Sequence, residues 1–176
     1  MDEYLSAQNY NSTASLVVIH MEHNYLFVIA RALHVIAVVL WIGGVAFVTT
    51  VLIPTIRNSQ SPENRLSIFE ALEGKFSSQA KLTTLITGFS GFYMLYVMNA
   101  WSSMQWWVYL MIFIWVIFTA VLFVLEPLFL HKWFHRRAKI DNGKTFFFLQ
   151  KMHIALLFLS LIAVFGGVAG VHGLFY

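Results

Sequence analysis

The residues of this chain best suited to chemistry are its seven histidines, because the sequence has no cysteine and imidazole is a good ligand for haem iron and for copper. Four long apolar runs fix the depth of each histidine in a membrane. The group predicted at the outer side comprises His20, His23, His34 and His172. The group predicted at the inner side comprises His131, His135 and His153. Imidazole inside a bilayer is costly to bury and usually functional, so these groups predict a ligand site at one face or at both.

The outer group fits two kinds of site. In the first, His34 and His172 are axial ligands of a b-type haem, since they lie at similar depth on helices that run in opposite directions. Arg31, one turn before His34, would contact a haem propionate. The other predicted haem contacts are Trp41, Gly44 and Gly170. In the second kind of site, His20, His23 and His34 bind copper that arrives from outside.

A further predicted metal ligand, His153, lies at the inner side. It is nineteen residues from His172 on the same helix, a separation of about 28 Å at 1.5 Å per residue. A single outer haem is therefore the simplest hypothesis. Whether His131, His135 and His153 form a second site is left open.

Each of these features also has an interpretation without a ligand. Gly166 and Gly170 match the small-xxx-small pattern by which membrane helices pack closely. His131 and His135 stand in a basic stretch that suits lipid headgroups, and the outer pair before the first run suits an exposed segment.

The composition indicates an all-α polytopic membrane protein. The chain of 176 residues is 59% hydrophobic and only 11% charged, whereas a soluble domain carries roughly 25% charged residues. A span needs about 20 apolar residues. The predicted spans of this four-helix bundle, which forms a single domain over residues 1–176, are about 32–56, 82–100, 106–130 and 154–176.

The positive charge predicts the direction of the spans. Ten of the eleven Lys and Arg residues flank the first and third loops, and residues 101–105 of the second loop have none. By the positive-inside rule the first and third loops are cytoplasmic and both termini face the periplasm or exterior, as expected in a bacterial inner membrane. Basic residues beside apolar runs act as topology signals, so we expect no nucleic-acid partner.

Two segments beside the spans are predicted to be helical. Residues 14–30 form an outer helix that either continues into the first span or lies in the interface; alternatively the first span begins near Tyr25 and is tilted. Ser61 followed by Pro62 is a helix-start signal. It predicts a short amphipathic helix from Pro62 to about Glu73 along the inner surface.

Glu126 is a carboxyl group in the inner third of the third span. It should be protonated or paired there, because an isolated charge is costly to bury. Its predicted partner is Lys81, Lys151 or His153, which lie at similar depth. A helix-pairing contact is favoured over a proton-transfer role, and Pro127 is expected to disturb the helix.

The stretch Arg31–Gly44, with Ala-Leu-His at residues 32–34 and Trp41 followed by small residues, resembles the first span of CopD-like copper-resistance membrane proteins and of HemJ-type protoporphyrinogen oxidases. Pro54 and Arg57 are also similar. The resemblance implies that His34 is a metal or haem ligand. Residues 106–110 lack the His and Lys of the HemJ third span, and the chain lacks Met-rich strings suited to copper relay.

These patterns predict a small membrane cytochrome with haem b, carrying electrons near the outer face as part of a larger redox complex or a homo-oligomer in the lipid. The alternatives are a CopD-like copper transport or copper-binding protein, a HemJ-like oxidase, and a structural subunit with incidental histidines. If the chain is an enzyme, it is an oxidoreductase.

Overall fold

The computed structural model describes the backbone of residues 2–130, 136–137 and 141–175, and side chains from residue 25 onward except those of residues 62, 129, 130 and 142. Every regular element in these ranges is helical. Three stretches are long and apolar enough to cross a membrane, namely Tyr25–Ser59, Trp106–Leu128 and Gly143–Val171. The chain is thus all-helical, with the lengths and composition of a multi-pass membrane protein.

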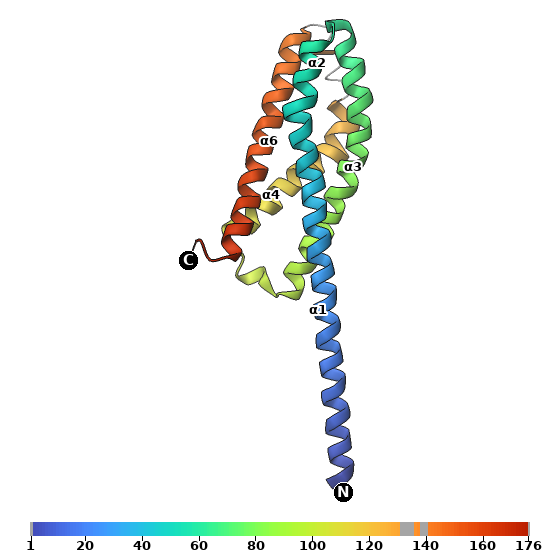
Figure 1. Ribbon diagram of the computed structural model, residues 1–176, viewed down its shortest axis with the longest axis vertical. Helices are drawn as coiled ribbons and strands as arrows, with labels where there is room; N and C mark the ends of the chain where they lie inside the picture. The colour runs from blue at the N-terminus through green and yellow to red at the C-terminus, as the bar shows by residue number, and fades with distance from the viewer. Residues whose placement is uncertain (1, 131–135, 138–140, 176) are drawn as a thin grey trace.

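The first predicted span lies in an unbroken run of helix. Helix α1 (Asp2–Phe47) passes through the π-helical segment η1 (Val48–Leu52) into α2 (Ile53–Ser59). Its N-terminal half extends beyond the rest of the structure (Figure 1). The backbone of residues 14–30 is therefore helical and continuous with the span, while its location outside the membrane stays a prediction.

Helix α3 (Pro62–Val97) corrects one prediction and qualifies another. It begins at Pro62 after the N-cap Ser61, as the sequence predicts, but it runs without a break past Glu73. The prediction of a separate surface helix is therefore wrong. This part of α3 packs on the bundle, where the ring centroids of Phe69 and Phe146, a residue near the start of the last helix, are 5.7 Å apart.

The second predicted span is the C-terminal part of α3. Only residues 82–97 of the predicted 82–100 are helical in α3, and the N-terminal half of that helix is charged. This is shorter than the roughly 20 apolar residues that a span needs. Helix α3 as a whole is long enough, but its charged and hydroxyl-bearing residues make it less apolar, and it is not among the three stretches that qualify by length and composition.

The third predicted span begins at Trp106, where the sequence places it. Helix α4 (Trp106–Ala120) continues into the π-helical segment η3 (Val121–Leu130), which contains Pro127. A proline removes one backbone donor and clashes with the preceding turn, so a departure from regular α-helix is expected here. Glu126 lies in the same π-helical segment.

Helix α6 (Asn142–Val171) starts earlier than the predicted 154 and ends at His172 as C-cap. The Asp141 carboxylate caps its first turn by accepting a hydrogen bond from the Lys144 backbone N–H at 2.9 Å. That bond and the nearby Lys144 ammonium hold the pKa of Asp141 below its ordinary value. The stabilisation is present above the unfolded-state pKa and is lost as the pH falls through the folded-state pKa.

The last part of α1 runs with α3 and α6 along the long axis, and α4 crosses the bundle at an angle to them, packed against α6 and α3 (Figure 1). At one end of the bundle, α2 leads to α3 and α6 starts. We call it the basic end, because Arg57, Arg65 and Lys144 lie there. We call the opposite end the tryptophan end; there α3 leads through η2 (Ala100–Ser102) to α4 and α6 finishes, and Trp101 and Trp106 lie there.

Candidate functional site

His34 is the best-anchored imidazole of the described residues. It lies on α1, is partly buried, and faces α3 rather than α6. Its Nδ1 lies 3.0 Å from the Thr87 carbonyl oxygen and 3.1 Å from the Ser90 Oγ. A carbonyl only accepts, so Nδ1 carries the proton and donates it. The Ser90 hydroxyl already donates to the Ile86 carbonyl at 2.5 Å, so its oxygen is an acceptor for the same N–H.

This anchoring decides which nitrogen of His34 is left for chemistry. In a neutral ring with the proton on Nδ1, the lone pair is on Nε2. Nε2 has no hydrogen-bond partner within the described part of the chain. An Nδ1–H held by a backbone carbonyl is the usual arrangement behind a metal-bound histidine. A Cβ on Gly91 would lie 3.1 Å from His34 Cε1, so this glycine lets the ring lie close to α3.

The second predicted axial ligand, His172, lies at the tryptophan end of the bundle, where it follows the last residue of α6. It is exposed, and its Nδ1 donates to the Val168 carbonyl oxygen at 2.7 Å, which also leaves Nε2 as the lone-pair nitrogen. Arg31 is exposed one turn before His34. The hydrogen bonds of the His34 and His172 side chains go to separate partners, Thr87 and Ser90 for His34 and Val168 for His172, and their joint ligation remains a prediction.

The space beside the predicted haem glycines is filled by aromatic side chains. A Cβ on Gly44 would meet the ring of Phe76, and one on Gly170 would meet the ring of Trp107 at 2.5 Å. The contacts of Gly44 and Gly170 are therefore those of residues that let helices pack closely, and aromatic rings occupy the space predicted for haem. Trp41 is 4% exposed and meets Phe118 edge to face at 4.8 Å between ring centroids.

The other histidines are placed apart from this site. His153 lies on α6 towards the basic end, partly buried, and its Nδ1 donates to the Leu149 carbonyl oxygen at 2.9 Å. His20 and His23 belong to the helical backbone of α1, but their side chains are outside the described residues, as are His131 and His135 altogether. Within the described ranges, no group of three or more His, Asp or Glu side chains could hold a metal ion.

A cavity of about 140 Å³ lies within the bundle in the half nearer the basic end. Side chains from all four bundle helices line it, mostly apolar ones. Its polar lining residues are Trp41, Glu70, Glu73, Ser77, Glu126 and His153. The indole N–H of Trp41 is buried with no hydrogen-bond partner among the described residues. Such a donor beside the other polar lining groups is a place for a bound water molecule.

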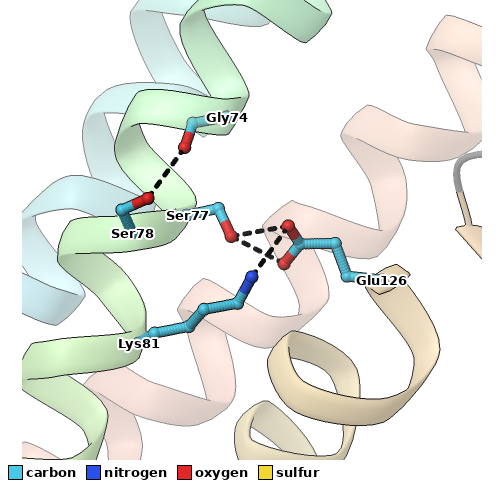
Figure 2. A network of polar contacts seen from close by, with 5 residues as sticks. All are labelled: Gly74, Ser77, Ser78, Lys81 and Glu126. Atoms are coloured by element: carbon cyan, nitrogen blue, oxygen red, sulfur yellow. Dashed lines mark hydrogen bonds and ion pairs between the residues drawn. The ribbon is translucent and has the colours of Figure 1, made fainter. Parts of the chain in front are cut away.

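Glu126 is held at this cavity by two residues of α3 (Figure 2). The Ser77 hydroxyl donates to its Oε1 and Oε2 at 2.6 and 2.7 Å, and the Lys81 ammonium lies 3.2 Å from Oε1. The predicted pairing of Glu126 with Lys81 is confirmed. The contact joins η3 to α3 across the bundle and neutralises both charges.

We expect Lys81→Met to destabilise the fold, because it leaves the Glu126 carboxylate with Ser77 as its remaining partner there. The side chains of Lys81 and Glu126 are 34% and 20% exposed, so we expect a cost of about 1–3 kcal/mol, below that of a fully buried pair. The thermal midpoint of helix loss in detergent measures it. Lys75→Met, which removes an exposed lysine from the same helix, is the matched control and should change little. Equal midpoints for the two variants would contradict the pairing.

Comparison of the chain with protein-family models, with curated proteins and with solved structures gives no match. The residues and contacts described above are therefore the basis for a proposed function.

Sequence reasoning missed the polar side chains that contact His34 and line the cavity. Ser77, Thr84, Thr87 and Ser90 recur every three or four residues, with Lys81 between them. That spacing is the signal of a polar face on one helix. It could have identified α3 as the helix on which His34 packs.

Proposed function

We propose that this chain is a small membrane haem protein in which His34 is an axial ligand of haem b and electrons pass near the tryptophan end. The observation that carries the proposal is the Nδ1–H of His34, which the Thr87 carbonyl and Ser90 Oγ hold in place while Nε2 keeps its lone pair. Haem supplies one-electron transfer when bound. The chain's own contribution is to fix the imidazole and its tautomer.

The donor set fits a second imidazole ligand at the same end of the bundle. His172 also carries its proton on Nδ1 and presents a lone pair on Nε2. It is the C-cap residue of α6, and its side chain is exposed. The exposed guanidinium of Arg31 is the candidate partner for a propionate. Gly44 and Gly170 have no part in this proposal, because aromatic rings fill the space beside them.

We also propose that α3 is a fourth span, with the basic end in the cytoplasm of a bacterial cell. Helix α3 packs along α1 and carries contacts at both ends of the bundle, from Phe69–Phe146 to Thr87–His34. Two of its buried hydroxyls, Ser77 and Ser90, are hydrogen-bonded to Glu126 and His34 of neighbouring helices, which offsets the cost of burying them. The excess of Lys and Arg at the basic end supports the orientation, and the resemblance of residues 31–44 to CopD-like proteins agrees with a ligand at His34.

The absorption spectrum of protein purified from haem-replete cells tests this function. We expect a Soret band that shifts on reduction, with about one haem per chain by pyridine haemochrome assay. Copper is measured by elemental analysis of the same sample. Colourless protein would overturn the haem proposal, and stoichiometric copper without porphyrin would replace it with the copper-binding alternative.

A further inference from the structure

Buried hydroxyl groups are concentrated on α3. Among the described residues, the structure has eight buried polar side chains, and five of them are on this one helix: Ser77, Thr83, Thr84, Thr87 and Ser90. Hydroxyls spaced by three or four residues follow one another turn by turn. From Ser77 to Ser90 they cover about 20 Å at 1.5 Å per residue, which is much of a hydrocarbon core about 30 Å thick.

Two of these hydroxyls have no partner within the described residues. The Oγ1 atoms of Thr84 and Thr87 are buried without a hydrogen bond. The neighbouring Thr83 differs, because its hydroxyl donates to the backbone carbonyls of Gln79 and Ala80 at 3.0 and 3.2 Å. Buried polar groups are nearly always hydrogen-bonded. A water molecule bound to the hydroxyl of Thr84, and one bound to that of Thr87, would supply the missing hydrogen bonds.

The cavity in the half nearer the basic end is lined by Ser77, the first hydroxyl of this row. It has room for several water molecules, and the unpartnered Trp41 N–H gives one of them a donor. Ser77 and Glu126 line it, and Lys81 bonds to Glu126 one turn further along α3. Glu70 and Glu73 line the side nearer the basic end.

We propose that this chain conducts protons along α3, from the cavity at Glu126 through the hydroxyls of Thr84 and Thr87 towards the tryptophan end. A proton from water on the basic side binds the Glu126 carboxylate. Each following water or hydroxyl accepts one proton and releases another, so no other bond changes along the row. Thr84, Thr87 and Ser90 are each about one turn apart, a distance of roughly 5 Å that a single bridging water spans. Ser77 and Thr84 are two turns apart, roughly 10 Å, so this step takes a short chain of waters beside Lys81.

Charge at the entrance sets the conditions for transfer. The titratable or charged groups that line the cavity with Glu126 are Glu70 and Glu73 from α3 and His153 from α6, with Lys81 bonded to the Glu126 carboxylate. The described lining residues of α1, η1 and α4 contribute none. Lys81 and Glu126 together are neutral, so a cation can approach. Because every group belongs to the chain itself, this activity is independent of the proposed haem.

Purified protein in liposomes with an internal pH dye tests the proposal. A potassium gradient with valinomycin drives protons inward, and the rate of acidification is recorded. We expect wild-type liposomes to acidify several-fold faster than protein-free liposomes, and we expect Glu126→Gln and Thr84→Val to lower the rate to that of protein-free liposomes. A wild-type rate equal to that of protein-free liposomes would overturn the proposal outright.

The two adjacent threonines give a matched control. Thr83→Val removes a buried hydroxyl that is already satisfied within the helix, so conduction should persist, and Thr84→Ser should also conduct because it keeps the hydroxyl. Folding of each variant is checked by helix content and by elution from a sizing column. Undiminished flux in a folded Thr84→Val, or equal loss in Thr83→Val and Thr84→Val, would contradict the assigned path. Since the assay needs no cofactor, its failure would leave the absorption spectrum, and the haem proposal, unaffected.

Discussion

His34→Ala is expected to abolish the Soret band of the purified protein. The substitution removes the ring whose Nδ1 is fixed by the Thr87 carbonyl and Ser90 Oγ and whose Nε2 is free to bind iron. Loss of an axial ligand should prevent stable haem binding, since an alanine methyl cannot ligate iron. The measurement is the ratio of Soret to protein absorbance in protein purified from haem-replete cells.

His153→Ala is the control for this experiment. Its ring has the same kind of Nδ1 bond to a backbone carbonyl, but it lies towards the basic end. The Soret band should survive this change. Gly91→Ala adds a more graded test, because the new Cβ would lie 3.1 Å from His34 Cε1 and the ring would have to shift by a few tenths of an ångström against its Nδ1 partners. Loss of a supporting contact behind a metal ligand costs about 10–100-fold in affinity. An unchanged Soret band in His34→Ala would rule out His34 as the ligand.

Gly88→Ala is expected to destabilise the bundle by about 1–3 kcal/mol through overpacking. An added Cβ would lie 2.6 Å from ring atoms of Trp115. That ring has little freedom to move, because its Nε1–H donates to the Thr84 carbonyl oxygen at 2.9 Å and it meets Phe92 edge to face at 5.3 Å between centroids. The thermal midpoint in detergent measures the effect.

The matched control is Gly43→Ala. A Cβ at Gly43 has nothing within 4 Å, and the residue is exposed near the C-terminal end of α1. Alanine lowers the conformational entropy of the unfolded chain, so this variant should be neutral or more stable by up to about 1 kcal/mol. If Gly88→Ala proved as stable as Gly43→Ala, the close packing of α3 against α4 at Trp115 would be wrong.

The elements that sequence reasoning placed well are those with local signals. Pro62 after Ser61 begins α3, and Trp106 begins α4, as predicted. Depth also narrowed the partners of Glu126 to Lys81, Lys151 or His153, because a buried carboxylate needs a cation, and the structure shows the pairing with Lys81. In each case the deciding residues are adjacent in sequence or fixed by the position of a span.

The predictions that failed or stayed open depend on how one helix is rotated against another. Sequence spacing gives the face of a helix but not its neighbour, so His34 was expected to face α6, whereas it packs on α3. The same lack of information left Gly44 and Gly170 open to a macrocycle, although Phe76 and Trp107 occupy the space beside them. The prediction of a short surface helix that ends near Glu73 was wrong because no residue near Gly74 stops α3. The first part of this helix also packs on the bundle, where Phe69 is buried.

The most direct test of the central claim, that the Nε2 of His34 binds haem iron, is pulsed electron paramagnetic resonance on oxidised protein labelled with ¹⁵N-histidine. We predict hyperfine coupling from histidine nitrogen to the ferric iron in the wild type and in His153→Ala, with no haem-bound signal in His34→Ala. A ferric centre without histidine coupling, or with the same coupling after His34→Ala, would contradict the account.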